Sequence, residues 1–332
     1  MLKFLVFSDL HYKKGMYAVK VQDLKDILKR GKENGVDFVL HAGDFSNDYV
    51  GSPEIVNTYL RNEYGFPVYG VYGNHELETE NNSMEVVTPL LTNDPHVARE
   101  SGDSGHYYID RNGYRFIFAD TNYSYNEAMQ AWEHNHTASW GEPEGNLYSD
   151  SLGPEQLKWL EAVLTDAARK EISCVLVSHA GFVEGRECSP DAKTVRALIR
   201  KVNGIRPGTV KMCINGHYHT NHLDWIEDVL YFDVNTAING FWLPRKAQHY
   251  TDAHTFQLED YDARGNYLRT KTVPLTELWQ SINTHYFQQP LSAVVTFCDD
   301  GTIRVEGSHT EWCYGIEPED AFPGTMPCIS SL

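Results

Sequence analysis

"KMCINGHYHTNH", residues 211–222, places three histidines directly after an apolar segment. The run Val210–Ile214 is short and almost continuously apolar, which is typical of a buried strand. His217 and His219 follow Gly216, at the point where that strand should end. A His-x-His pair alone is a weak signal, so its meaning depends on whether other segments supply partners.

Other apolar runs have the same strand character, and segments with a helical period of apolar residues lie between them. This alternation predicts an α/β fold with helices on the faces of a sheet. The predicted helices occupy residues 18–35, 151–170 and 189–202. The other predicted strands are Leu2–Phe7, Val36–Leu40, Pro67–Tyr72, Arg115–Ala119 and Ile172–Val177.

Two turn signals predict hairpins. Asn112-Gly113 lies between two alternating runs, and Asp299-Asp300-Gly301 joins two short apolar segments near the C-terminus. Beyond Leu230 the chain consists of short strands and turns. We therefore expect a main domain over residues 1–274, with a small β-rich appendage over residues 275–332 packed on it.

Each of five predicted strands is followed at once by a side chain that can bind a metal ion. In open α/β sheets, ligands bind at the carboxyl ends of the strands, so these side chains are expected to converge. Taken singly, each is as well explained by a turn or a structural histidine; the set of five carries the prediction. The candidates are Asp9 and His11, Asp44, Asn74, His179, and the pair His217 and His219.

Four imidazoles, two carboxylates and one amide oxygen make up this set. Mixed nitrogen and oxygen donors suit Mn, Fe, Zn or Co rather than Ca or Mg. Seven donors exceed the needs of one tetrahedral ion and match two ions that share a carboxylate. Two such ions, about 3.5–4 Å apart, can activate a bridging water and clamp the oxygens of a phosphoryl group.

The order D-x-H, GD, GNHE, H and GHxH resembles the calcineurin-like metallophosphoesterase family over roughly residues 1–240. The resemblance implies a two-sheet β-sandwich flanked by helices, with two transition-metal ions (Mn, Fe or Zn) at the strand ends. It also implies that His75 is catalytic and acts on the phosphate rather than on a metal. The implied ligands are Asp9, His11 and His219 for one ion, Asn74, His179 and His217 for the other, and Asp44 as the bridge.

Net charge is −18, which disfavours a broad nucleic-acid-binding face. The six cysteines contain no C-x-x-C pair, and the N-terminus has no secretory apolar region. We see no stretch long enough to span a bilayer. These features predict a cytoplasmic protein with no membrane partner, and they leave the oligomeric state open. A small phosphorylated substrate is what the family resemblance implies.

The segment 122–149 is long and aromatic, as binding loops often are. Its aromatic side chains either line a substrate pocket or pack in a cluster of their own; they are Tyr123, Tyr125, Trp132, Trp140 and Tyr148. His134 and His136 lack a carboxylate spaced to complete a further metal site. Arg186, Arg245 and Lys246 are candidates for binding an anion, although surface charges are the ordinary explanation.

These observations predict a metal-dependent hydrolase that uses a metal-bridging hydroxide, most simply a phosphodiesterase acting on a small molecule. Three alternatives remain open: a phosphatase with the same site, a nuclease, and a non-catalytic scaffold of the same fold. A nuclease would need a basic surface, and a scaffold would be expected to have lost ligands, whereas all seven are present.

Overall fold

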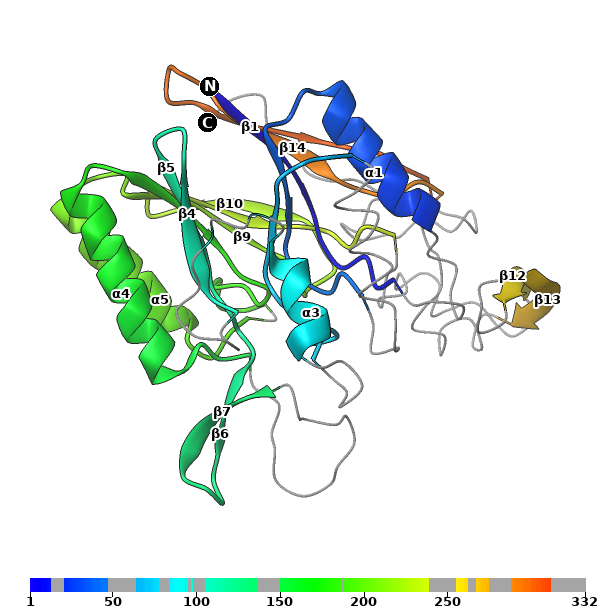
Figure 1. Ribbon diagram of the computed structural model, residues 1–332, viewed down its shortest axis with the longest axis horizontal. Helices are drawn as coiled ribbons and strands as arrows, with labels where there is room; N and C mark the ends of the chain where they lie inside the picture. The colour runs from blue at the N-terminus through cyan, green and yellow to red at the C-terminus, as the bar shows by residue number, and fades with distance from the viewer. Residues whose placement is uncertain are drawn as a thin grey trace.

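The computed structural model describes residues 1–12, 21–46, 64–77, 84–92, 94, 97, 105–135, 150–186, 188–238, 255–261, 267–274 and 288–311. Two large sheets form the centre of the protein, with helices outside them (Figure 1). The first sheet contains, in spatial order, β15 (Ile303–Gly307), β14 (Ala293–Phe297), β1 (Leu2–Phe7), β2 (Phe38–His41) and β3 (Val68–Gly70). The second contains β10 (His222–Ile226), β11 (Val229–Asp233), β9 (Val210–Asn215), β8 (Ser173–Val177), β5 (Tyr114–Phe118) and β4 (Tyr107–Arg111).

Four helices and two small hairpins complete the described elements. The helices are α1 (Val21–Glu33), α3 (Met84–Leu91), α4 (Gly153–Arg169) and α5 (Ala192–Ile205). The hairpins are β6 (Tyr123–Asn126) with β7 (Ala131–His134), and β12 (Thr255–Tyr261) with β13 (Tyr267–Pro274). Figure 1 shows α4 and α5 together on one side of the molecule, α1 on the opposite side, and β6–β7 projecting from the body.

Both faces of the second sheet are covered, and successive side chains of its strands pack into two different cores. On β5, Phe116 and Phe118 enter the core shared with the first sheet, where the Phe116 ring lies 5.4 Å from that of Phe4. Ile117, between them, belongs to a second core formed with α4 and α5. Since successive strand residues point to opposite faces, a nearly continuous apolar run is what a doubly covered strand requires.

The strand directions bring the predicted site together. β1, β2 and β3 are parallel to one another, and so are β11, β9, β8 and β5. All six apolar runs of the sequence correspond to strands in these two sheets. The α/β fold, with two sheets flanked by helices, is confirmed.

The first predicted hairpin is also confirmed. Asn112 and Gly113 join β4 to β5, and both have positive φ, at 47° and 83°. Positive φ at both central residues is the requirement of a type I′ turn, and Asn-Gly is the pair that adopts it most readily.

The C-terminal hairpin is part of the first sheet. β14 pairs antiparallel with β1, from Leu2 opposite Phe297 to Val6 opposite Ala293, and β15 extends the sheet beyond it. The boundary expected at residue 274 stays a prediction. The two strands beyond it contribute directly to the core of the main sandwich. No helix in the described ranges has the length and apolarity that crossing a bilayer requires.

We expect Phe297→Ala to lower the free energy of unfolding by about 3–5 kcal/mol, because burial and packing of a core phenylalanine are lost. Phe297 is 2% exposed, and its ring lies 4.6 Å from that of Tyr114 in the second sheet. Urea denaturation measures the change. Arg304→Ala, at an exposed position of β15, is the control and should stay within about 0.5 kcal/mol. Equal effects of the two changes would contradict a core role for the hairpin.

Candidate metal centre

All seven predicted ligands lie just beyond strand ends, and both sheets contribute. The first sheet supplies four: Asp9 and His11 after β1, Asp44 after β2, and Asn74 after β3. The second supplies the other three: His179 after β8, and His217 and His219 after β9. The site therefore lies where the carboxyl ends of strands from the two sheets meet.

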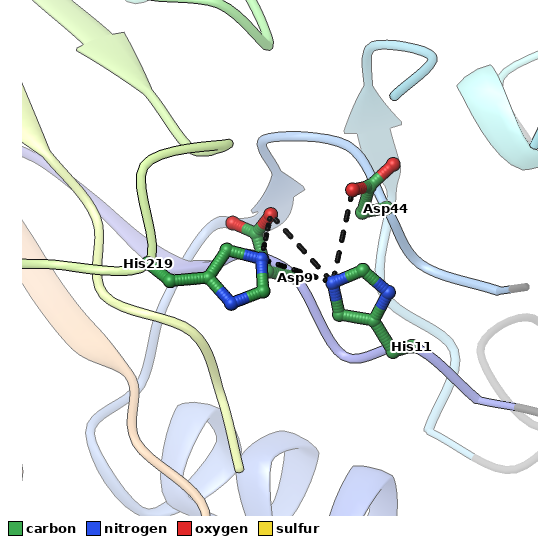
Figure 2. Close-up of side chains that lie close together, drawn as sticks. All are labelled: Asp9, His11, Asp44 and His219. Atoms are coloured by element: carbon green, nitrogen blue, oxygen red, sulfur yellow. Dashed lines mark hydrogen bonds and ion pairs between the residues drawn. The ribbon is translucent and has the colours of Figure 1, made fainter. Parts of the chain in front are cut away.

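Four of these residues form a compact group, shown in Figure 2. The potential donor atoms of Asp9, His11, Asp44 and His219 all lie within 4.8 Å of one another, and all four side chains are buried. His219 Nε2 is 3.2 Å from Asp9 Oδ1 and 3.1 Å from His11 Nε2. His11 Nε2 is 3.7 Å from Asp44 Oδ2. One ion could therefore be held here by two imidazoles and two carboxylates.

A second group shares Asp44 with the first. It consists of Asp44, His179 and His217, again with donor atoms within 4.8 Å of one another. His179 Nε2 lies 3.3 Å from Asp44 Oδ2, 3.1 Å from Asn74 Oδ1 and 3.3 Å from His217 Nδ1. The amide oxygen of Asn74 therefore lies beside this group. Asp44 is the one residue common to both groups.

The donors suit transition-metal ions. In each group two imidazole nitrogens face one another at about hydrogen-bond distance, Nε2 to Nε2 between His11 and His219, and Nδ1 to Nε2 between His217 and His179. Such a pair can share one proton at most, whereas a cation between them accepts a lone pair from both. With carboxylate oxygens beside them, these nitrogens form a set that suits Mn, Fe, Co or Zn.

Buried charges within the group shift one another's pKa values. Burial opposes ionisation of Asp44, but the positive charge of His179 leads the opposing effects and holds the Asp44 pKa well below its usual value. The same attraction overcomes burial at His179 and raises its pKa to about 10. His11 behaves in the opposite way, because burial and the nearby charge of His75 lower its pKa to about 3. In the ion-free protein, a proton on His179 thus offsets the Asp44 charge.

The backbone at the site adopts a conformation that few residues other than glycine adopt. Five of the seven candidate ligands have positive φ: Asp9 at 51°, His11 at 49°, Asp44 at 47°, His217 at 70° and His219 at 55°. Left-handed backbone outside glycine is uncommon, and in sparsely populated regions it costs of order 1–3 kcal/mol per residue. The concentration of such residues in one place is typical of a functional site.

Hydrogen bonds between the loops hold these conformations. The Asp9 amide donates to the Gly43 carbonyl at 3.0 Å, and the His11 amide donates to the Asp44 carbonyl at 2.9 Å. The Thr236 hydroxyl, beyond the end of β11, donates to the Asp9 carbonyl at 2.8 Å. The loops after three strands are thereby tied to one another.

The glycines that precede the ligands act in two different ways. Gly43 has a φ of 95°, a backbone conformation that glycine adopts without steric cost. At Gly73 and Gly216 the reason is close approach. A Cβ on Gly73 would lie 2.0 Å from Asp44 Oδ1, and one on Gly216 would lie 1.9 Å from Ser8 Oγ. Side chains at these positions would displace the site.

Glu76 is a buried residue of the site whose role the sequence did not predict. Its fully buried carboxylate accepts hydrogen bonds from the amides of Gly73 at 2.7 Å, Ser46 at 2.8 Å and Asp44 at 3.1 Å. Burial and the nearby Asp44 raise its pKa to about 8, against the effect of the amides. Glu76 thus joins the loop that carries Asp44 to the loop that carries Asn74. The signal was present as the last residue of the GNHE motif.

His75 lies beside the two donor groups. Its Nε2 is 3.9 Å from Asp44 Oδ2, and its ring meets that of His11 edge-on at 4.7 Å. The amide of His75 donates to Asp44 Oδ1 at 2.9 Å. Its side chain is 14% exposed, more than those of His11 and Asp44.

The remaining candidates have other partners or lie outside the described ranges. His134 Nε2 contacts Asp120 Oδ2 at 2.8 Å, so this histidine pairs with a carboxylate that the sequence spacing did not reveal. Arg186 forms ion pairs with Asp224 and Asp233. Tyr125 and Trp132 are paired across the β6–β7 hairpin at 5.7 Å, each about two-fifths exposed. The other candidates lie outside the described residues: His136, Trp140, Tyr148, Arg245 and Lys246.

Comparisons with known proteins show which family the chain belongs to. The family model for calcineurin-like phosphoesterases matches residues 2–221. A dimetal phosphatase from Danio rerio has a similar structure, with a TM-score of 0.52 and 13% identity over 92% of this chain and 95% of that chain. GAP50, described as the anchor in the inner membrane complex of Plasmodium, has a TM-score of 0.47 and 11% identity over 96% and 90% of the two chains. The search of curated proteins returned no match.

We expect ion binding at pH 7 to release protons. His179 is protonated at that pH, because its pKa is about 10, and it must lose its proton to bind an ion. His11, with a pKa of about 3, is already neutral. Ion affinity should therefore rise as pH rises from 6 towards 10. Calorimetric titration with Mn²⁺ in buffers of different protonation enthalpy measures the protons released. No release, or proton uptake, would contradict the charge state assigned to His179.

Proposed function

The chain belongs to the calcineurin-like phosphoesterase family and is a phosphoric ester hydrolase that depends on metal ions, and we propose that its substrate is a small phosphodiester. The observation that carries this function is the position of Asp44 in two adjoining groups of metal donors. Two ions that share a carboxylate are the arrangement that phosphoryl hydrolysis uses to clamp both attacking and leaving oxygens.

In this proposal the ligands divide as their distances suggest. Asp9, His11 and His219 would hold one ion, Asn74, His179 and His217 would hold the other, and Asp44 would contact both. When bound, Mn, Fe or Zn ions would activate a water molecule and offset the negative charge that develops on the phosphoryl oxygens. The identity of the ions depends on their supply, because the same donors accept several transition metals.

His75 is the proposed catalytic side chain. It lies next to Asp44 but belongs to neither donor group, and its ring is partly exposed where the ligands are buried. A protonated imidazole in this position can hydrogen-bond a phosphoryl oxygen, or donate its proton to the leaving oxygen. General-acid catalysis of this kind contributes about 10²–10⁴-fold to rate.

The preference for a diester is supported by charge. A phosphomonoester carries about −1.5 to −2 charges at neutral pH, whereas a diester carries one. Asp150 adds a carboxylate beside His217, and Arg186 is neutralised by Asp224 and Asp233. Arg186 is the one sequence candidate for anion binding that lies within the described residues. The Asp150 carboxylate at the site would disfavour a dianion more than a monoanion. The proposed location remains the cytoplasm.

We expect a higher kcat/KM on bis(p-nitrophenyl) phosphate than on p-nitrophenyl phosphate, with Mn²⁺ present. Steady-state rates on the two substrates measure the preference. Asp44→Asn should abolish both activities, because it weakens the carboxylate on which both donor groups depend. A preference for the monoester would make the protein a phosphatase with the same centre. Full activity of Asp44→Asn would contradict the shared carboxylate.

We expect His75→Ala to lower kcat by about 10²–10⁴-fold on the diester while the bound metal stays unchanged. The reason is that His75 acts on the phosphate and not on the ions. Rates are compared with metal content measured by inductively coupled plasma mass spectrometry. Loss of metal in this variant would show that His75 is itself a metal ligand. Unchanged kcat would remove it from the mechanism.

A further inference from the structure

Asp150 lies at the outer side of His217. Its Oδ2 is 3.4 Å from His217 Nε2, and the two side chains are 19% and 13% exposed. The other ring nitrogen of His217, Nδ1, points towards His179 Nε2 at 3.3 Å, inside the second donor group. The imidazole is therefore placed between a carboxylate on one side and the candidate ion site on the other.

We propose that Asp150 is a positioning residue, which fixes the orientation and the tautomer of His217 so that Nδ1 is free to bind an ion. This inference rests on the proposed metal centre. A neutral imidazole carries its proton on one nitrogen and its lone pair on the other, so an acceptor next to Nε2 directs the lone pair to Nδ1. Metal-binding histidines usually donate their outer N–H to a carboxylate or carbonyl in this way.

His179 shows the same arrangement with a different acceptor. Its Nδ1 lies 2.7 Å from the carbonyl oxygen of Ala42, so that Nε2 faces Asp44 and Asn74. The backbone itself thus fixes His179. His217 depends instead on a side chain, which a substitution can remove without changing the ligand.

The chain holds Asp150 firmly enough for this role. The next residue, Ser151, exchanges backbone hydrogen bonds with Tyr123 at 3.0 and 3.3 Å. The Leu152 amide then donates to Asp191 Oδ2 at 2.8 Å. Two fixed points immediately after Asp150 restrict where its carboxylate can lie.

Asp150 acts on His217 and not directly on an ion. Among the described residues, it belongs to neither group of donors whose atoms lie within 4.8 Å of one another. Its Oδ1 is buried and has no hydrogen-bond partner in that part of the chain. A largely buried carboxylate needs a compensating partner, and within the described ranges the imidazole of His217 forms an ion pair with it.

The test measures ion binding and not only activity. Ion-free wild-type protein and the variants Asp150→Ala, Asp150→Asn and Asp191→Asn are titrated with Co²⁺. The absorption spectrum reports the geometry of the ligands, and competition with a chelator gives the affinities. Asp191→Asn is the matched control, because it removes a carboxylate charge from the same segment and keeps a side-chain oxygen that can accept the Leu152 amide.

We expect Asp150→Ala to weaken binding of one of the two Co²⁺ ions, the one that His217 would hold, by about 10–100-fold and to change the Co²⁺ spectrum. Asp150→Asn keeps an acceptor oxygen for His217 Nε2–H and should recover most of that loss. Asp191→Asn should bind both ions with wild-type affinity. In Asp150→Ala, excess Mn²⁺ should restore much of kcat, because the ligands themselves remain.

Two results would overturn the inference. Wild-type affinities and spectrum in Asp150→Ala would show that His217 needs no such partner. Complete loss of one ion in both Asp150 variants would make Asp150 a ligand rather than a positioning residue. A wild-type protein that binds fewer than two Co²⁺ ions would instead contradict the proposed centre, so the two failures are distinguishable.

Discussion

The Asp44 carboxylate is the interaction on which the rest of the site depends, because its oxygens lie within reach of both donor groups. The surrounding chain holds it from several sides. The amide of His75 donates a hydrogen bond to one carboxylate oxygen of Asp44 at 2.9 Å, and the backbone amide of Asp44 donates a hydrogen bond to Glu76. Gly73, which has no side chain, leaves the space that the Asp44 carboxylate fills. A small displacement of this carboxylate would separate the two donor groups, and the hydrogen bonds between the neighbouring loops oppose such a displacement.

Such a site is costly in folding free energy. Asp9 and Asp44 are almost completely buried, and a buried carboxylate is unfavourable unless it is paired with a positive group. In the ion-free protein the His179 proton supplies part of that compensation, and bound ions would supply more. The left-handed backbone at five ligands adds conformational strain. The two sheets, whose strands before these loops are buried at almost every position, provide a rigid frame that can support both the buried charges and the strained backbone.

Much of this could be predicted from sequence, and what could not has physical reasons. Asp9, Asp44 and His179 were recognisable because each follows an apolar run whose carboxyl end is constrained to one edge of a parallel sheet. Asp150 was not, because its contact with His217 links segments 67 positions apart and no local pattern encodes it. Pairing between β1 and β14 joins the two ends of the chain, so the apolar pattern predicted the strands but not their partners. Glu76 lies within a quoted motif, yet its role is visible only in the three amides that surround it.

Anomalous diffraction from crystals grown with Mn²⁺ tests the central claim most directly. The account predicts two peaks about 3.5–4 Å apart, one among Asp9, His11, Asp44 and His219, the other among Asp44, Asn74, His179 and His217, with Asp44 in contact with both. A single peak, or two peaks that do not share Asp44, would contradict it.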